Sequence, residues 1–191
     1  MQNDAKPDFG IYHHSSKEKS EGIRKHVRLL FNQAFSSSGI ARDSGISILD
    51  VGGGLGFAAS IAAEFFNRSR ITCIDTFTDG SLKDSSIDRG RRNMEILGIS
   101  DRVSFMDQDI MQIDDGLGKF DLVVSNLVLH NLGKRRFEAY ERIARVMREE
   151  ALFINGDLFM QGSRGDTFRN DLKKILKFYT VIGHFNAHDS V

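Results

Sequence analysis

The stretch ILDVGGGLGFAA, residues 48–59, runs from an apolar segment straight into four glycines and then into an alanine-rich segment. Backbone can approach a ligand closely only where side chains are missing, and glycine also tolerates the backbone conformations of a tight turn. Gly52 and Gly54 suit such a turn, and Gly56 opens a segment whose helical N-terminal amides would face a ligand. The stretch therefore predicts a strand, a ligand-binding loop and a helix in succession.

Outward from this stretch, apolar runs alternate along the chain with segments of helical periodicity. That alternation is typical of a mostly parallel sheet with helices on both faces, so we predict a doubly wound α/β fold. In such folds ligands bind at the carboxyl ends of the strands, where the order of connections reverses. The predicted strands are 45–51, 70–75, 102–107, 120–126, 151–158 and 179–185, and the predicted helices are 16–36, 56–67, a segment within 82–98, 134–149 and 166–178.

Composition limits the kind of protein. A chain of 191 residues with 40% hydrophobic content can bury one core and is short for two ordinary domains. Lys and Arg together number 26, as do Asp and Glu, so no net charge attracts nucleic acid or an anionic membrane. Cys73 is the sole cysteine, which fits a reducing compartment, and no apolar run suits a transmembrane helix or a signal peptide. We therefore expect a cytoplasmic protein without a membrane anchor.

The glycine spacing separates two classes of cofactor. Gly54, Gly56 and Ala59 fit the dinucleotide pattern GxGxxG/A, with Asp75 at a suitable distance to bind a ribose. Counted from the end of the strand, however, the pattern is DxGxGxG from Asp50 to Gly56, and this register argues against a dinucleotide. It resembles motif I of the class I methyltransferases that depend on S-adenosylmethionine (SAM), in which the loop holds the methionine part of the cofactor. The resemblance implies cofactor contacts from Asp50, Gly52, Gly53, Gly54 and Gly56.

Further residues match the family in order along the chain. Asp75 matches the acidic residue that accepts hydrogen bonds from both ribose hydroxyls, and Thr76 and Phe77 follow where the family places residues flanking the adenine. Asp109 matches the residue that accepts a hydrogen bond from the adenine amino group, and Ile110 supplies a backbone amide. From the residues alone, Asp75 also fits an ordinary strand end, and Asp109 fits a helix cap.

The segment FDLVVSNLVLHNL, residues 120–132, resembles the fourth-strand motif of the family and places Ser125 and Asn126 beside the transferable methyl. His130 follows, where many small-molecule members carry a histidine that orients a nucleophile or acts as general base. The alternative is a histidine that caps the next helix. In all, the resemblance covers about residues 46–158. His and carboxylate residues do not cluster at metal-ligand spacing, so we expect no metal.

The N-terminal segment is expected to help form the acceptor site. The family carries a lid here, so residues 1–40 are expected to form a helical lid on a SAM-binding domain of residues 41–191. Tyr12, His13 and His14 precede the helix of this lid and are candidate substrate contacts. The alternative is that they are ordinary surface residues.

The identity of the acceptor leaves several hypotheses open. Members that methylate nucleobase amino groups or glutamine often carry a (D/N)PP(Y/F) motif after the fourth strand, whereas this chain reads SNLVLH at residues 125–130. Basic residues cluster within 134–148, but interleaved glutamates favour a solvated helix face over a nucleic-acid surface. We therefore expect transfer of a methyl group from SAM to a small molecule, leaving S-adenosylhomocysteine (SAH), by a monomer or a homodimer. The alternatives are RNA or protein methylation, a non-catalytic SAM-binding subunit and, least favoured, a nicotinamide oxidoreductase.

The end of the chain departs from the family pattern. The usual sheet closes with an antiparallel hairpin of two strands, but only NAHDSV, residues 186–191, follows the predicted strand 179–185. We therefore expect the final antiparallel strand to be missing or the chain to be truncated.

Overall fold

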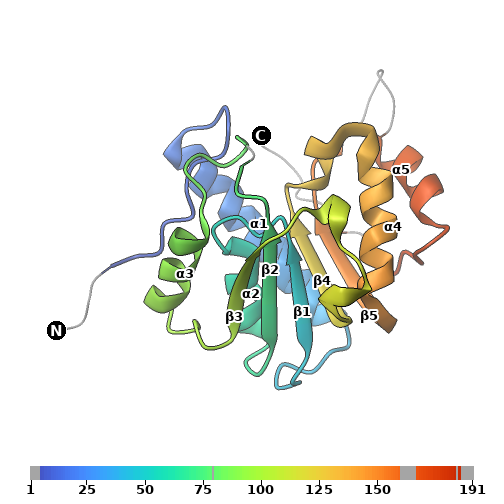
Figure 1. Cartoon of the computed structure of the whole chain (residues 1–191), viewed down its shortest axis with the longest axis horizontal. Helices are drawn as coiled ribbons and strands as arrows, with labels where there is room; N and C mark the ends of the chain where they lie inside the picture. Colours follow the sequence, from blue (N-terminus) through green and yellow to red (C-terminus); the bar gives the residue numbers. More distant parts are fainter. Residues whose placement is uncertain (1–4, 79, 160–166, 184, 186–191) are drawn as a thin grey trace.

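A five-stranded parallel sheet organises the chain in the computed structural model (Figure 1). The structure describes residues 5–78, 80–159, 167–183 and 185. The strands are β1 Ser47–Val51, β2 Arg70–Asp75, β3 Val103–Asp107, β4 Phe120–Asn126 and β5 Met147–Gly156. They lie in the order β3-β2-β1-β4-β5, so the direction of the connections reverses between β1 and β4. The predicted doubly wound fold is confirmed.

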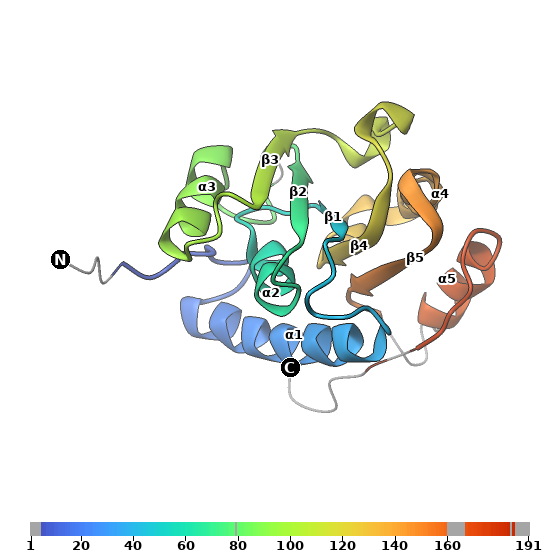
Figure 2. The same cartoon turned by 90° about the horizontal axis from the view of Figure 1, so that it is seen from below.

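Helices cover both faces of this sheet, and α1 runs along the outer side of α2 (Figure 2). The α-helices are α1 Lys17–Ser37, α2 Phe57–Phe65, α3 Ile87–Ile96, α4 Arg136–Val146 and α5 Thr167–Ile175. The described residues also form the short 3-10 helices η1 Ile110–Gln112, η2 Asp115–Leu117 and η3 Leu129–Arg135. None of the helices in the described part of the chain has the length and apolar character that crossing a membrane requires.

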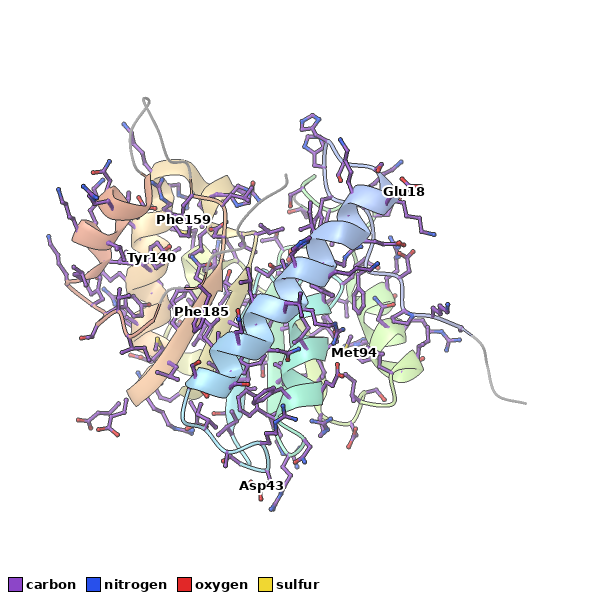
Figure 3. All side chains as sticks on the ribbon, turned by 180° about the vertical axis from the view of Figure 1, so that it is seen from behind. Glu18, Asp43, Met94, Tyr140, Phe159 and Phe185 are labelled. Carbon is purple, nitrogen blue, oxygen red and sulfur yellow. The ribbon has the colours of Figure 1, made fainter. Side chains whose placement is uncertain are left out.

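The first predicted helix is confirmed as α1, and its apolar stripe is part of the core. Phe31 and Phe35 are almost completely buried. The ring centroid of Phe35 lies 5.4 Å from that of Phe65 and 5.2 Å from that of Phe66, at the end of α2. Figure 3 shows α1 crossing the rear of the molecule over α2. Burial of these aromatic rings holds α1 against the sheet domain.

The predicted helix over 134–149 is wrong at its end. The helix stops at Val146, and Met147 already belongs to β5, where it pairs with Phe120 at the start of β4. The register then shifts before Leu122, and Glu150 adopts a left-handed φ of 62°. Pairing with β4 therefore overrides the helical periodicity of this segment.

The predicted strand over 179–185 is also wrong, because none of its described residues is in a strand. The amides of Phe178 and Tyr179 both donate to the carbonyl of Ile175, which continues the turn of α5. The Tyr179 hydroxyl donates to the carbonyl of Tyr140 at 2.6 Å, which ties this segment to α4. Within the part of the chain that the structure describes, β5 is consequently the last strand of the sheet, and no antiparallel strand joins it.

Candidate functional site

The glycine loop after β1 closes against β2 and leaves one position open. The amides of Gly52 and Gly53 donate to the carbonyl of Ile74 at 2.8 and 3.0 Å. Gly52 has a φ of 67°, and a Cβ added there would lie 2.3 Å from Val128 Cγ2. At Gly54, whose φ is 49°, an added Cβ would meet only the tip of Leu82 within 3.4 Å. The loop therefore needs glycine for close packing at Gly52 and for an open approach at Gly54.

Asp75 lies at the end of β2, directly beside this loop. Its Oδ2 accepts a hydrogen bond from the Gly54 amide at 2.9 Å, and its Oδ1 accepts one from the Phe77 amide at 2.8 Å. The predicted neighbours Gly54 and Asp75 are thus brought together, and Asp75 also shapes the loop itself.

Asp50 lies behind the loop, with only 1% of its surface exposed. Its Oδ2 accepts a hydrogen bond from the Ala59 amide at 3.0 Å, in the first turn of α2, whereas Oδ1 has no partner among the described residues. Burial is the main cause that raises the pKa of Asp50 from its usual 3.8 to about 7. The Ala59 amide opposes this rise, and the charge of Asp75 adds to it.

The titration of Asp50 should make stability depend on pH. Because the pKa is about 7 in the folded state and near 3.8 in the unfolded chain, the folded protein holds an extra proton between these values. Stability therefore falls as pH rises through this window and levels off above it. We expect the free energy of unfolding of Asp50→Asn, relative to wild type, to rise by up to about 1.4 kcal/mol per pH unit between pH 4 and 7. Urea unfolding from pH 4 to 9 measures this, and parallel curves would contradict it.

The segment after β3 begins a 3-10 helix. Asp109 Oδ1 accepts a hydrogen bond from the Met111 amide at 2.8 Å and so caps η1, while Ile110 is buried. The Gln108 amide donates to the carbonyl of Asp75 at 3.0 Å, which keeps this segment beside the end of β2. Asp109 is therefore a helix cap, and its predicted contact with adenine stays a prediction.

Ser125 and Asn126 end β4 next to the glycine loop, since Ser125 pairs with Val51 in the parallel ladder. Ser125 Oγ and Asn126 Oδ1 are buried and have no hydrogen-bond partner among the described residues. Asn126 Nδ2 donates to the Tyr12 hydroxyl at 3.5 Å. Buried polar atoms normally have partners, so unpaired ones at the ends of strands indicate a place for a polar ligand.

His130 forms a pair with a residue that the sequence did not suggest. Its Nδ1 lies 2.5 Å from Asp157 Oδ1, and its backbone amide donates to Asp157 Oδ2 at 3.0 Å. The Asp157 side chain is 3% exposed and the His130 side chain 33%, so the imidazole reaches solvent while its carboxylate partner does not. His130 Nε2 has no hydrogen bond to any described residue. Asp157 follows Gly156 at the end of β5, which pairs with Asn126 at the end of β4.

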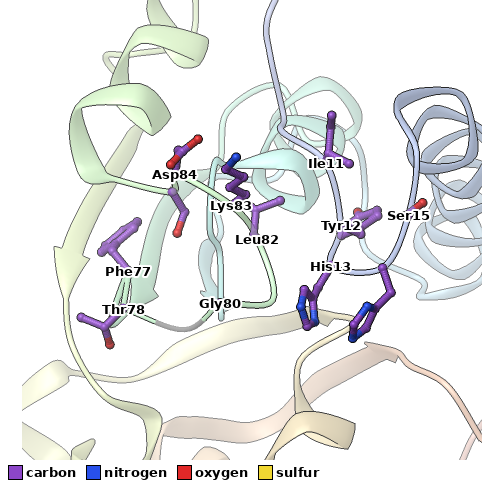
Figure 4. Close-up of a pocket in the computed structure, with 12 residues that line it drawn as sticks. Ile11, Tyr12, His13, Ser15, Phe77, Thr78, Gly80, Leu82, Lys83 and Asp84 are labelled. Carbon is purple, nitrogen blue, oxygen red and sulfur yellow. The ribbon is translucent and has the colours of Figure 1, made fainter.

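A cleft of about 500 Å³ lies between the N-terminal segment and the loop that follows β2 (Figure 4). It is lined by residues 11–15, 77–78, 80 and 82–85. Tyr12 is half-buried in it, whereas His13 and His14 are exposed and stack on each other, with ring centroids 3.7 Å apart. Thr76 lies at its edge, where its Oγ1 accepts a hydrogen bond from the Thr78 hydroxyl at 3.1 Å.

Strained backbone gathers around the same region. His14, Phe77 and Leu127 have φ values of 57°, 55° and 57°, in the left-handed region that side chains other than glycine rarely adopt. His14 and Phe77 line the cleft, and Leu127 directly follows Asn126. Strain of this kind persists where the surrounding structure enforces it, and it concentrates at functional sites.

Comparison with known families identifies this arrangement. A sequence model described as a methyltransferase domain matches residues 42–177. The chain belongs to the methyltransferase-domain family. Its fold is that of the class I SAM-dependent methyltransferases.

The individual relatives of this chain differ in what their names say they act on. It is 34% identical over 97 residues to the release factor glutamine methyltransferase of Chlorobaculum tepidum, covering 49% of this chain and 31% of that protein. The chain thus spans about a third of the length of this curated relative. Among solved structures, it superposes with a TM-score of 0.65 on the StiE O-MT domain, at 18% identity, covering 85% of this chain and 55% of that one. A ribosomal protein L11 methylase from Lactobacillus delbrueckii subsp. bulgaricus gives a TM-score of 0.61 at 17% identity, covering 83% of this chain and 73% of that one.

Proposed function

We propose that this methyltransferase moves a methyl group from SAM to a hydroxyl of a small molecule, with His130 as general base. The observation that carries the proposal is the hydrogen bond between His130 Nδ1 and the buried carboxylate of Asp157, which leaves Nε2 available. A base is required only when the acceptor atom carries a proton that must leave, as a neutral hydroxyl does.

The cofactor fits the residues present. SAM supplies a methyl group that its sulfonium already activates. An added Cβ at Gly54 would lie 4.0 Å from Asp75 Oδ2, so the open glycine backbone leads directly to the carboxylate proposed to bind the ribose. The unpartnered Asn126 Oδ1 lies at the end of β4, whereas Asp75 lies at the end of β2. The direction of the connections reverses between these two strands. We assign Asp50, Gly52, Gly53, Gly54, Gly56, Asp75, Thr76, Phe77, Asp109, Ile110, Ser125 and Asn126 to this site as part of the proposal.

The proposed chemistry depends on the tautomer of His130. Asp157 accepts a hydrogen bond from Nδ1–H and so keeps the lone pair of the imidazole on Nε2. Nε2 would take the proton of the acceptor hydroxyl as that oxygen replaces the SAM sulfur on the methyl carbon, with SAH as the leaving group. The carboxylate of Asp157 would stabilise the imidazolium that results. Holding the acceptor oxygen on the axis of the breaking bond, about 3 Å from the methyl carbon, provides much of the rate enhancement.

The similarity to a release factor glutamine methyltransferase makes a protein acceptor the second candidate. Against it, residues 125–130 read SNLVLH and lack the prolines of the motif found in glutamine and nucleobase methylation. The small-molecule hydroxyl therefore remains the function we favour.

Two measurements test the function in sequence. In thermal unfolding, SAM or SAH at 100 times its dissociation constant should stabilise the fold by about 2.7 kcal/mol, whereas NAD and NADP should leave it unchanged. Radiolabelled SAM is then incubated with phenols, catechols and aliphatic hydroxy acids, with a release-factor protein and with RNA. Label in a hydroxylated small molecule supports the proposal. Label only in protein or RNA would overturn it.

Loss of the Asp75 carboxylate should weaken cofactor binding strongly. Asp75→Ala removes the proposed partner of both ribose hydroxyls and the acceptor that holds the Gly54 and Phe77 amides. We expect a loss of about 2 to 3 kcal/mol, or roughly 30- to 150-fold in SAH affinity, by calorimetric titration. Asp114→Ala is a matched control, because Asp114 accepts a hydrogen bond from the Gly116 amide away from the cleft. Equal affinity of Asp75→Ala and wild type would remove Asp75 from the site.

A further inference from the structure

Residues 8–13, here called the strap, cross the carboxyl end of the sheet before α1 begins. At one end the Asp8 amide donates to Asn93 Oδ1 at 2.8 Å, and Asn93 Nδ2 donates back to the Asp8 carbonyl at 2.9 Å, from α3. At the other end the His13 amide donates to the Ser81 carbonyl at 2.9 Å. The strap is thereby held to α3 and to the loop after β2, and Tyr12 lies in the cleft (Figure 4).

Arg24 of α1 holds the middle of the strap. Its side chain is largely buried, and Nη2 donates to the carbonyl of Phe9 at 2.9 Å and also to the carbonyl of Gly10. The guanidinium lies over the ring of Tyr12, 4.9 Å from its centroid, and 5.9 Å from that of Phe57 at the start of α2. One side chain therefore joins α1, the strap and the helix that follows the glycine loop.

The charge of Arg24 is poorly compensated for a buried group. Its Nε has no hydrogen-bond partner, and no carboxylate among the described residues pairs with it. Burying an unpaired charge costs free energy that an apolar side chain of similar size would not cost. By contrast, Arg28, one turn further along α1 and also 5.9 Å from the Phe57 ring centroid, pairs with Glu64 at 2.5 Å. Stability alone therefore does not explain an arginine at position 24.

We propose that Arg24 is a positioning residue of the transfer site, which holds the strap so that the Tyr12 hydroxyl meets Asn126 at the end of β4. The contacts run from the Arg24 guanidinium to the Tyr12 ring and from the Tyr12 hydroxyl to Asn126 Nδ2 at 3.5 Å. This inference rests on the proposed function, since Asn126 matters to it as part of the transfer site.

The electrostatic surroundings of Tyr12 agree with this arrangement. Burial is the main cause that raises the pKa of Tyr12, and the charge of Arg24 partly offsets the rise. Tyr12 consequently keeps its proton at neutral pH and presents a hydroxyl that can both donate and accept. Lysine could not replace the arginine fully, because it lacks the planar guanidinium group that lies over the Tyr12 ring while Nη2 donates to the two carbonyls.

Fluorine NMR of the full chain labelled with 3-fluorotyrosine tests the role of Arg24. The chain has three tyrosines, and Tyr12→Phe assigns the signal of Tyr12 by removing it. Tyr140 lies in the core on the α4 face and Tyr179 packs against it, with ring centroids 6.3 Å apart, so their signals report the fold. The compared proteins are wild type, Arg24→Met, Arg24→Lys and the matched control Arg28→Met, each free and titrated with SAH.

In the free proteins, Arg24→Met should move the Tyr12 signal to its position in the urea-unfolded chain, while the Tyr140 and Tyr179 signals stay in place. Arg24→Lys should give an intermediate position, and Arg28→Met should match wild type. An unmoved Tyr12 signal in Arg24→Met would overturn the proposal. Movement of all three signals in both Arg24 variants would also overturn it, because Arg24 would then stabilise the whole domain.

Titration with SAH separates positioning from cofactor binding. In wild type, SAH should shift the Tyr12 signal, and in Arg24→Met this response should be lost while affinity falls by no more than about tenfold. A much larger loss of affinity would make Arg24 a cofactor contact and overturn its positioning role. Failure of wild type to bind SAH would contradict the proposed function instead, and the comparison of the free proteins would still decide the role of Arg24.

Discussion

Replacing His130 with alanine should lower kcat for a hydroxyl acceptor by about 10²- to 10⁴-fold, the usual contribution of a positioned general base. The reason is the loss of Nε2, the atom that takes the acceptor proton, from a side chain that Asp157 otherwise holds at 2.5 Å. SAH affinity should stay close to that of wild type, because His130 lies on the β4–β5 side of the site and the glycine loop follows β1. Initial rates with the acceptor found by the radiolabel screen, and calorimetry with SAH, measure the two quantities.

The pH dependence of the same variant provides its control. At a pH above the pKa of the acceptor hydroxyl, the acceptor ionises without a base. The rates of wild type and His130→Ala should therefore converge at high pH. Asp157→Asn should also slow transfer, because an amide can donate to Nδ1 and move the imidazole proton to Nε2. Equal kcat for wild type and His130→Ala at neutral pH would show that the acceptor needs no base from this residue.

Sequence alone predicts which residues meet at the carboxyl ends of β1 and β2, for a physical reason. Asp50, the glycines and Asp75 are separated by short, regular segments, so their positions follow from the strand order of a doubly wound sheet. The hydrogen bond between the Gly54 amide and Asp75 agrees with that expectation. What spacing could not reveal is that Asp75 also holds the Phe77 amide, a contact that depends on the left-handed φ of Phe77.

The proposed acceptor side is harder to predict, because its contacts are made between distant segments. Asp157 lies within the strand predicted over 151–158, whereas the actual β5 ends at Gly156 and leaves Asp157 at the edge beside His130. The sequence feature that could have indicated the pair of His130 and Asp157 was an acidic residue near the end of the strand next to β4. The sequence did not indicate a role for Arg24. Helical periodicity predicts that an arginine faces solvent, and it cannot reveal that the strap covers this one.

Replacing Gly54 with valine should lower SAH affinity by more than about 300-fold while the domain stays folded. The new branched side chain would stand where the backbone is open, with its Cβ 4.0 Å from Asp75 Oδ2, and would fill the approach to that carboxylate. Its one close neighbour is Leu82 Cδ2 at 3.0 Å, the flexible end of a side chain that can move aside. A φ of 49° costs a non-glycine residue about 1 to 2 kcal/mol, which a domain of this size tolerates.

Two other glycines separate loss of binding from loss of folding in this prediction. Gly98 has a φ of 68° with no atom within 4 Å of an added Cβ, so Gly98→Val should lose similar stability in urea and bind SAH as wild type does. Gly52→Val should lose much more stability, because its Cβ would lie 2.3 Å from the Val128 side chain. If calorimetry finds that Gly54→Val and Gly98→Val bind SAH equally well, backbone strain is the only consequence of the change at Gly54. The space beside Gly54 would then not be part of the ligand-binding site. A ligand that contacts Gly54 cannot occupy the same space as a valine side chain.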